Sequence, residues 1–432
     1  MQYSSEKINK LKNTPLFKHM IQSEQDFLIE KTLQYNISFQ EFIKLTEISI
    51  DLNMWKHESI KKFWPELSFT QAGNIPQIKN KILKDLIKRW DALKKSKKTY
   101  SSSPGQVERD DKLSKLDFRP ATKNGKVLGK CPVASEKTLC CNLTTLDAIE
   151  NCGFECSYCS IQSFYPHNKI YYNETLSEKL DALNFDPDKI YHIGTGQSSD
   201  SLFAGNRGKT LDQLMEFARI NPNVILEFKT KSKNIHYFLK GIIPKNIIVT
   251  WSINPDSVIA NEEINTATLK ERINAARKLS NKGILVGFHF HPMIYFENYQ
   301  VEYEEISKKI QTLFTPNEVA LISIGTLTFT KPTMREIRKK SIKSQILKME
   351  LIDAAGKFSY PDEIKEEMFK HLFKSFSPYW QKEVFFYLCM EKPDIWNKVF
   401  ETVYPDNESL EKEMKSNYMK KINDLRALNV SN

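Results

Sequence analysis

The chain has 432 residues, of which 40% are hydrophobic and 27% charged, and its formal net charge is +10. No apolar run approaches the roughly 18 residues that a membrane-spanning helix needs, and the polar start Met1–Glu6 lacks the apolar stretch of a signal peptide. We therefore expect a cytoplasmic protein with no membrane partner, and its length predicts a main domain plus a second unit.

Residues 1–95 are predicted to form a helical N-terminal region. The run Ser38-Phe-Gln-Glu41 is a capping box that opens an apolar helical segment. Apolar residues from Ile78 to Leu93 recur at helical spacing with lysines opposite. Lysines can neutralise nucleic-acid phosphates, so the net charge is compatible with a polyanionic partner. For this stripe, a packed helix with a solvated face is the preferred interpretation over a phosphate-binding one.

A linker is predicted over residues 96–127. Its composition turns to Lys, Ser, Thr, Asp and Pro, and Ser101–Gly105 is the clearest break in regular structure.

Three cysteines, Cys152, Cys156 and Cys159, follow one another at C-x3-C-x2-C spacing. Three thiolates on one tight loop can hold three irons of a 4Fe-4S cluster and leave the fourth iron open for a small molecule. A structural zinc site favours four protein ligands, usually in two short pairs, and no further cysteine follows until Cys389. The open cluster is the preferred interpretation, and a zinc site or three uncommitted thiols are the alternatives.

Four other cysteines are Cys131, the adjacent Cys140 and Cys141, and Cys389. In a reducing compartment seven cysteines favour metal or redox roles over disulfides. These four thiols could hold a second Fe-S cluster or a zinc ion if the C-terminal segment folds back. One of them could instead donate a hydrogen atom, or all could be packed as small hydrophobic residues.

Short β-rich runs alternate with helical stretches over residues 128–330, which is the pattern of βα units around a parallel sheet. The predicted strands are Leu143–Ile149, Lys189–Ile193, Val224–Phe228, Asn246–Trp251, Ile284–Phe290 and Val319–Ile324. Six such units predict an α/β fold with a partial (β/α)6 barrel of the TIM type, preceded and followed by helical segments.

Polar or ligating residues stand at or just after the end of each predicted strand. In barrels of this type, reactive groups gather at the carboxyl ends of the strands. Asp200 could accept a hydrogen bond from a ligand or cap a helix, and Lys231 could pair with a carboxylate or be solvated. Ser252 and Asn254 could hold a ribose or an amino-acid moiety, although an Asn before a proline also forms turns.

His289 and His291, two residues apart, point to the same side of their strand. Two interpretations stay open for them. They could face the barrel cavity and act on a substrate, or they could form a satisfied structural pair.

Residues 331–432 are predicted to be a basic and aromatic helical region. Its basic residues cluster from Arg335 to Lys343, and its aromatic residues run from Phe373 to Tyr387. Such groups can grip phosphates and stack on bases, whereas aromatic helices more often form a core. We expect this region to close the open side of the barrel and to contribute to substrate specificity.

The cysteine spacing, with Tyr158 just before the last cysteine, resembles that of the radical S-adenosylmethionine (SAM) superfamily. The resemblance implies that the open iron binds the amino and carboxylate groups of SAM, and that the reduced cluster cleaves SAM to a 5′-deoxyadenosyl radical. The implied cofactors are a 4Fe-4S cluster and SAM.

A more particular resemblance connects six ordered segments to the spore photoproduct lyase family, over roughly residues 115 to 400. They are the cysteine loop with Ile161-Gln162, Gly194–Leu202, Lys229–Ser232, Trp251–Pro255, Thr266–Arg272 and Val286–Pro292. The founding enzyme of that family repairs a thymine dimer in DNA. The resemblance implies that Cys152, Cys156 and Cys159 bind the cluster, and that Asp200, Lys231, Ser252 and Asn254 contact SAM.

One departure concerns the return of a hydrogen atom. The dimer-repairing enzyme has a hydrogen-donating cysteine where this chain has Gln197, and an amide cannot donate a hydrogen atom as a thiol does. The tyrosine after its last cluster cysteine is Ser160 here, although Tyr158 is present. The candidate catalytic residues are therefore Tyr158, Cys140 and Cys141.

The sequence thus predicts a lyase-like radical SAM enzyme acting on a nucleic acid, with DNA and pyrimidine-dimer repair favoured. The implied partners are that nucleic acid and an electron donor such as flavodoxin or ferredoxin. Two alternatives stay open: a radical SAM enzyme that modifies a protein or a small metabolite, and a non-catalytic Fe-S or zinc protein that binds nucleic acid.

Overall fold

The computed structural model describes residues 5–66, 74–96, 98–100, 116–122, 126–131, 137–163, 165, 169–340, 342–354 and 356–430. The chain divides into two compact units. A helical unit comprises residues 1–99 and 329–358, and a sheet unit comprises residues 100–328 and 359–432.

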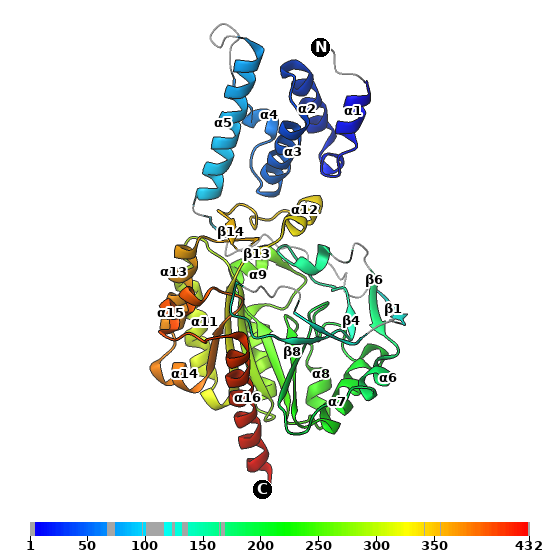
Figure 1. Ribbon diagram of the computed structural model, residues 1–432, viewed down its shortest axis with the longest axis vertical. Coiled ribbons are helices and arrows are strands. Elements are labelled where there is room, and N and C mark those ends of the chain that lie inside the picture. The colour runs from blue at the N-terminus through cyan, green and yellow to red at the C-terminus, as the bar shows by residue number, and fades with distance from the viewer. Residues whose placement is uncertain are drawn as a thin grey trace. The chain divides into compact units, whose positions relative to one another are not determined.

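The helical unit is built mainly from amphipathic helices (Figure 1). They are α1 (Ser5–Lys12), α2 (Gln22–Tyr35), α3 (Phe39–Met54), α4 (Ile60–Phe63), α5 (Ile75–Lys95) and α12 (Lys331–Lys339). The predicted capping box is confirmed: the Ser38 hydroxyl accepts from the Glu41 amide, and the Glu41 carboxylate accepts from the Ser38 amide at 2.7 Å. These two bonds fix the start of α3.

Helix α5 carries the predicted apolar stripe. Its buried side chains are Ile78, Ile82, Leu86 and Trp90. On its flank, Lys79 lies 3.1 Å from the Glu41 carboxylate. This arrangement matches a packed helix with a solvated face, the interpretation preferred from the sequence.

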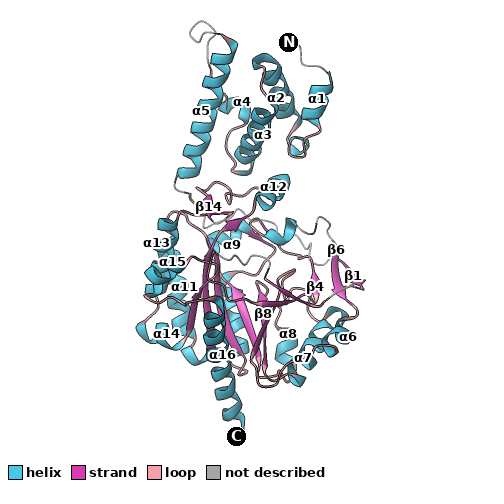
Figure 2. Ribbon diagram, viewed as in Figure 1, coloured by secondary structure: helices cyan, strands magenta, loops and turns pink. Residues whose placement is uncertain are grey.

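The sheet unit contains one eight-stranded sheet, in the order β16-β12-β11-β9-β8-β7-β3-β2 (Figure 2). Its strands are β2 (Leu128–Lys130), β3 (Thr144–Leu146), β7 (Tyr191–Thr195), β8 (Val224–Thr230), β9 (Ile247–Ser252), β11 (Leu285–Met293), β12 (Val319–Thr326) and β16 (Phe385–Leu388). All neighbouring pairs are parallel except β2 and β3. Every residue of β9 and β12 is buried, as expected for parallel strands covered on both faces.

Helices follow the strands and surround the sheet (Figure 1). They are α6 (Leu176–Asp181), α7 (Thr210–Ile220), α8 (His236–Lys240), α9 (Asp256–Glu262), α10 (Leu269–Ser280), α11 (Tyr299–Leu313), α13 (Asp362–Lys374), α14 (Pro378–Glu383), α15 (Pro393–Phe400) and α16 (Asn407–Val430). Helix α16 packs on the inner face, where the Tyr418 ring meets the rings of His192 and Phe385 edge-on.

The two edges of the sheet meet through the segments that flank them. Leu139, between β2 and β3, forms an antiparallel bridge with Glu391, which follows β16. The Leu139 amide donates to the Glu391 carbonyl at 2.9 Å. The Glu391 carboxylate is in turn held at 2.8 Å by the buried ammonium of Lys365. We call this junction the seam, and it draws the sheet into a curled partial barrel.

The remaining strands form smaller sheets. They are β1 (Asp117–Ala121), β4 (Ile149–Glu150), β5 (Glu155–Cys156), β6 (Lys169–Asn173), β10 (Glu263–Ile264), β13 (Thr328–Phe329), β14 (Ile352–Ala354) and β15 (Lys357–Ser359). Their pairing gives the orders β1-β6-β4, β10-β5 and β13-β15-β14.

The predicted partial barrel is confirmed, and each of the six predicted strands contributes to the large sheet. The sequence did not reveal the two edge strands, β2 and β16. Strand β2 has only three residues, and β16 lies in a segment whose aromatic residues also suit a helix.

Two of the predicted boundaries differ from the structure. Within the predicted linker 96–127, Asp117–Ala121 is a strand paired in parallel with β6, because its Phe118 packs on Phe203 of the sheet unit. The break at Ser101–Gly105 lies outside the described residues. The predicted region 331–432 is split, since residues 329–358 cluster with the helical unit and 359–432 with the sheet unit.

The aromatic residues of the C-terminal part mostly form a core. The Phe373 ring lies 5.2 Å from that of Phe386 and 4.8 Å from that of Phe400, both edge-on. Trp380 is buried, whereas Tyr379 is 60% exposed. This packing matches a core function rather than a base-stacking platform.

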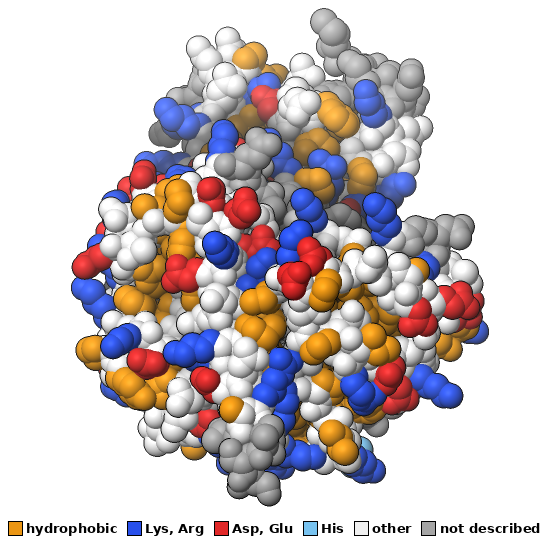
Figure 3. Space-filling view, turned by 60° about the horizontal axis from the view of Figure 1, so that its bottom comes forward, with side chains coloured by type: hydrophobic (Ala, Val, Ile, Leu, Met, Phe, Trp, Pro, Cys, Tyr) orange, Lys and Arg blue, Asp and Glu red, His pale blue; other side chains and the backbone are white. Residues whose placement is uncertain are grey.

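Surface charges of both signs are interspersed on the face that Figure 3 shows. Among the described residues, no helix combines the length and apolar character needed to cross a membrane.

Candidate active site on the inner face of the sheet

The loop that carries Cys152, Cys156 and Cys159 is held in one shape by hydrogen bonds. Asn151 has a left-handed backbone, and its side-chain oxygen accepts from the Cys152 amide at 2.9 Å. The Asn151 carbonyl accepts from the Ser199 hydroxyl at 2.7 Å. Cys156 lies on β5, and its carbonyl accepts from the Cys159 amide at 3.1 Å. The three thiols therefore project from one rigid turn.

Two of these thiols, Cys152 and Cys156, have a raised pKa, so a nearby cation would favour their ionised form. Burial raises the pKa of Cys156 well above its ordinary value, Lys231 lowers it, and the charges of Cys159 and Cys152 raise it again. Burial likewise raises the pKa of Cys152, with a further contribution from Asp200. Iron bound to sulfur would supply the missing positive charge.

The thiol arrangement fits an iron-sulfur cluster. Among the described residues, no group of three or more His, Cys, Asp or Glu side chains is placed to hold a single metal ion. In a four-iron cluster each thiolate binds a different iron, so the thiols need not converge on one atom. A zinc ion at this loop stays the alternative interpretation.

Behind this loop lies a fully buried ion pair. Glu263, on β10 beside Cys156, pairs with Arg272 of α10, and both side chains are completely buried. Burial disfavours the Glu263 charge, yet Arg272 and Lys231 hold the pKa of this carboxyl down to about 2. The Tyr158 hydroxyl donates to the same carboxylate, and the Lys231 ammonium lies 5.7 Å from the Tyr158 ring centroid. A charged network thus connects the cysteine loop to Lys231.

Arg272 also organises the carboxyl end of β9. Its guanidinium donates to the Ser252 carbonyl at 2.7 Å and to the Ala267 carbonyl at 2.9 Å. The buried Asn254 amide donates to Glu263 at 2.8 Å and accepts from the Tyr303 hydroxyl at 2.7 Å. Asn254 is therefore engaged within the fold.

Asp200 ties together two strand ends. One carboxylate oxygen accepts from the Leu202 amide at 2.9 Å and the Thr230 hydroxyl at 2.7 Å. The other accepts from the Lys231 amide at 2.6 Å. Nearby, Gly196 has φ +86, and a Cβ there would lie 2.9 Å from the Lys229 carbonyl. The backbone after β7 and the backbone before Lys231 therefore approach closely.

Strand register assigns further side chains to the inner face, because paired residues share a face and side chains alternate along a strand. The pairs connect Gly129, Thr145, Gly194 and Glu227 in one row of neighbours, which continues to Ile248 on β9. Two residues further on β9, Thr250 shares this face and pairs with Gly287. The same face carries His289, which pairs with Ser323, and Ser323 pairs with Tyr387.

A buried polar network lies on this inner face. The Glu227 carboxylate contacts His192 at 3.0 Å and His289 at 2.8 Å, and it accepts from the Thr250 hydroxyl at 2.7 Å. Burial and the charge of Lys229 lower the pKa of His289 to about 4. His289 is thus neutral and engaged with Glu227, which is closer to the satisfied structural pair than to a proton-transferring one.

The other four cysteines lie at the seam. Cys131 follows β2, and the Gln197 amide donates to its sulfur at 3.4 Å. The Cys140 amide donates to the Asn407 side chain at 2.8 Å. The Cys389 amide donates to the Ile324 carbonyl at 2.8 Å, which extends the pairing of β16 with β12. The C-terminal segment therefore does fold back to the upstream cysteines.

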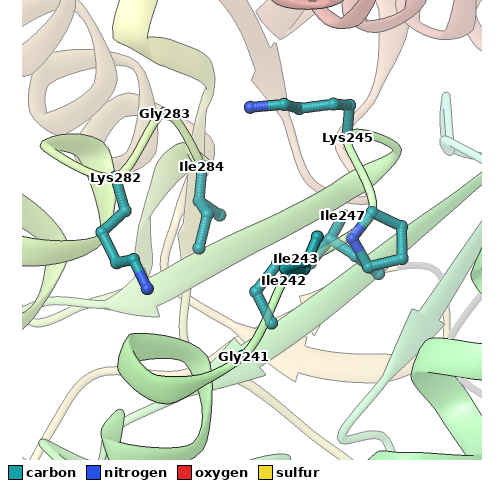
Figure 4. A pocket seen from close by; sticks show the side chains of 9 residues that line it. Gly241, Ile242, Ile243, Lys245, Ile247, Lys282, Gly283 and Ile284 are labelled. Carbon is teal, nitrogen blue, oxygen red and sulfur yellow. The ribbon is translucent and has the colours of Figure 1, made fainter.

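A pocket of about 380 Å³ lies at the other end of the sheet, where β9 and β11 begin (Figure 4). Its lining residues include Ile242, Lys245 and Lys282. The Lys282 ammonium donates to the Leu239 carbonyl at 2.5 Å. In parallel-barrel proteins the amino ends of strands serve stability more than chemistry, so this pocket is not a candidate active site.

A curled, mostly parallel sheet that carries a three-thiol loop defines the protein as an α/β partial barrel. The family model described as spore photoproduct lyase matches residues 145–389, more than half of the chain. The chain belongs to the spore photoproduct lyase family.

Relatives at the sequence level are distant. A spore photoproduct lyase of Clostridium acetobutylicum is 26% identical over 220 residues, which is 50% of this chain and 64% of the relative. The spore photoproduct lyase of Bacillus subtilis is 25% identical over 202 residues, covering 45% of this chain and 59% of the relative. The chain thus spans less than two thirds of each of these relatives.

Solved structures share the fold. Spore photoproduct lyase complexed with dinucleoside spore photoproduct has a TM-score of 0.54 and 19% identity, with 66% of this chain and 86% of that chain covered. A mutant of that enzyme with bound AdoMet and dinucleoside spore photoproduct gives a TM-score of 0.53 at 20% identity, with the same coverage.

Several site residues were missed from the sequence: Glu227, Glu263, and the contribution of Arg272. Glu227 left a signal, because a carboxylate inside the apolar run Val224–Phe228 is unusual for a buried parallel strand. Glu263 and Arg272 lie nine residues apart and left no comparable signal, since either would serve equally well on a solvated helix.

Proposed function

We propose that the protein is a radical SAM enzyme that acts on a lesion or another modified site in a nucleic acid, with DNA favoured. The observation that carries this proposal is the rigid three-thiol loop on the inner side of the curled sheet, within the segment that the family model matches. A 4Fe-4S cluster held there by Cys152, Cys156 and Cys159 would bind SAM at its open iron and supply the electron that splits SAM to a 5′-deoxyadenosyl radical.

The chain's own residues would bind and orient these groups. Lys231 brings a positive charge beside the loop, suited to the carboxylate of SAM. Ser252 lies at the end of β9, where a hydroxyl could meet the ribose or amino-acid part. In this proposal Asp200 and Asn254 position other residues and do not contact SAM themselves. Asp200 accepts a hydrogen bond from the Lys231 amide, and Asn254 donates one to Glu263.

The nucleic-acid substrate is supported by the family and by the net charge of +10. A solved spore photoproduct lyase was determined with dinucleoside spore photoproduct, which makes a dinucleoside lesion the first substrate to test. The reducing electron would come from a protein such as flavodoxin or ferredoxin.

A second candidate, a different radical reaction on a nucleic acid, is favoured by Gln197. The Gln197 amide has a strong N–H bond and cannot return a hydrogen atom. The last step of dimer repair, which returns a hydrogen atom to the substrate radical, would therefore need another donor. Tyr158, Cys140 and Cys141 are the candidates proposed from the sequence. The Tyr158 hydroxyl donates to Glu263, and Cys140 and Cys141 lie at the seam with two further thiols.

The test is anaerobic reconstitution with iron and sulfide, followed by reduction in the presence of SAM. The expected result is 5′-deoxyadenosine, measured by mass spectrometry, in amounts that rise when dinucleoside spore photoproduct is added. Undamaged thymidine dinucleotide is the control. A reconstituted cluster that never consumes SAM would refute the enzyme proposal and favour a binding protein. SAM cleavage without any response to the lesion would refute the repair ending and leave the second candidate.

A further inference from the structure

The four cysteines at the seam come from two distant parts of the chain, three of them from residues 131–141 and the fourth at Cys389. Cys131 extends one edge of the sheet and Cys389 extends the other. Cys131 continues the inner-face row of Gly129, and Cys389 continues that of Tyr387, because each lies two residues further along its strand direction. Both thiols therefore project to the inner face, from opposite edges.

Backbone hydrogen bonds fix these positions. The Cys131 amide donates to the Leu143 carbonyl at 3.1 Å, which continues the pairing of β2 with β3. The Cys389 amide donates to Ile324 at 2.8 Å. Between them, the bridge of Leu139 with Glu391 brings Cys140 and Cys141 to the same place, because Cys140 directly follows Leu139. The seam thus sets the positions of all four thiols.

Interactions among the side chains show that the four thiols are near one another. The Cys141 thiol shares a side-chain hydrogen bond with Cys140 and interacts electrostatically with Cys389. Cys389 interacts in turn with Cys131. The Lys229 ammonium interacts with Cys389, Cys141 and Cys131, and it lies on the neighbouring part of the inner face beside Glu227. One partly buried cation therefore serves several thiols.

We propose that Cys131, Cys140, Cys141 and Cys389 hold a second four-iron cluster at the seam, closed by four thiolates and separate from the loop cluster. Four is the number of cysteines that closes such a cluster. On binding, each thiol loses its proton and forms one sulfur–iron bond, and Lys229 offsets part of the resulting negative charge. The Gln197 amide, which already donates to the Cys131 sulfur, is the kind of N–H donor that tunes a cluster's potential.

The observations favour a cluster over the two other uses of these thiols. A single zinc ion takes ligands that converge on one point, whereas the Cys131 and Cys389 thiols project from opposite edges of the sheet. A hydrogen donor needs one accessible thiol, whereas here four thiols gather; Cys140 is only 2% exposed, and Cys141 is partly exposed. In this inference, Cys140 and Cys141 are ligands rather than donors.

The experiment removes the loop cluster first. The triple variant Cys152→Ala/Cys156→Ala/Cys159→Ala is purified and reconstituted anaerobically beside the unaltered protein. We expect about eight irons per chain in the unaltered protein and about four in the triple variant. The reduced triple variant should give an electron paramagnetic resonance signal that SAM does not change, because each iron already has a cysteine ligand.

Two further variants locate the iron. Adding Cys131→Ala or Cys389→Ala to the triple variant should remove most of the remaining iron and sulfide, from opposite edges of the sheet. Ser323→Ala is the matched control, since Ser323 shares the inner face and its buried hydroxyl has no hydrogen-bond partner among the described residues. The control should keep the iron. Circular dichroism checks that each protein is folded.

Three results would overturn the inference. They are a folded triple variant without iron, one zinc ion in place of iron and sulfide, and iron that persists after Cys131 or Cys389 is replaced. None of these outcomes depends on SAM cleavage, which is measured separately on the unaltered protein. The seam cluster and the proposed enzyme activity can therefore fail independently.

Discussion

The two groups of cysteines are built in opposite ways. Cys152, Cys156 and Cys159 come from eight consecutive residues, and local hydrogen bonds shape their turn. Cys131, Cys140, Cys141 and Cys389 come together only because the edges of the sheet meet. The first group is a property of a loop, and the second is a property of the whole fold.

The largest expected effect comes from removing one loop thiol. Cys156→Ala should reduce 5′-deoxyadenosine formation to background, because two thiolates do not hold the cluster in the geometry that leaves one iron open. Iron content should fall by about half if the seam holds its own cluster. The control Ser160→Ala should keep both iron and activity. Substantial SAM cleavage by the Cys156 variant would contradict the assignment of the loop.

A second effect tests how the loop is supported from behind. Glu263→Gln leaves the buried Arg272 guanidinium without its carboxylate, which should cost about 3–5 kcal/mol in unfolding free energy. The measurement is urea denaturation followed by circular dichroism. Glu318→Gln is the matched control, because Glu318 pairs with Arg277 nearer the surface and its loss should cost about 1 kcal/mol or less. Equal costs would show that the buried pair does not support the loop.

A third effect concerns the inner face between the two groups and depends on pH. The pKa of His289 is about 4 in the folded protein, below its ordinary value near 6.5. Between these values the unfolded chain takes up a proton that the folded chain does not, so stability falls as pH falls, by about 3 kcal/mol over this range. His289→Gln should reduce this dependence in urea denaturation at pH 4 to 7, leaving the contribution of His291, whose pKa burial lowers to about 3.

The control for this pH series is His19→Gln, which alters an exposed histidine of the helical unit. Its pH dependence should match that of the unaltered protein. An unchanged slope in the His289 variant would mean that another group governs acid sensitivity on the inner face.

The smallest effect targets the seam. Asn407→Ala removes the acceptor of the Cys140 amide, and the loss of one hydrogen bond of this kind should cost about 1 kcal/mol. A chelator should then remove iron from the seam faster, while the rate of iron loss from the loop cluster should stay unchanged. Asn423→Ala, an exposed change on the same helix, should alter neither rate. Equal acceleration at both clusters would contradict a local role for Asn407.

Sequence reasoning predicted the sheet because its central strands are apolar over their whole length, as in Val319–Ile324. It also located the loop, because the spacing of Cys152, Cys156 and Cys159 is itself the chemical signal. It missed β2, since three residues carry too little periodicity, and β16, since aromatic residues suit a helix as well as a strand.

The supporting residues were harder to predict for a different physical reason. The position of the Glu263–Arg272 pair behind the cysteine loop depends on β10 lying beside β5, a contact between segments about one hundred residues apart. The position of Cys389 beside Cys131 depends on the curl of eight strands. Such placements follow from tertiary packing, and no local pattern encodes them. Glu227 was the exception, because burial makes a charge in an apolar run conspicuous.

The bridge between Leu139 and Glu391 has a consequence for biogenesis. About 250 residues separate its two halves, so synthesis must pass Glu391 before they can meet. The loop thiols emerge far earlier and lie within one short turn. Metal delivery to the three-cysteine turn can begin on the nascent chain, whereas the four-cysteine junction can be loaded only after synthesis has passed Cys389. An assembly protein that supplied iron to both sites would therefore bind two different forms of the chain. The first is the nascent chain with its three-cysteine loop, and the second is the nearly folded chain with its four-cysteine junction.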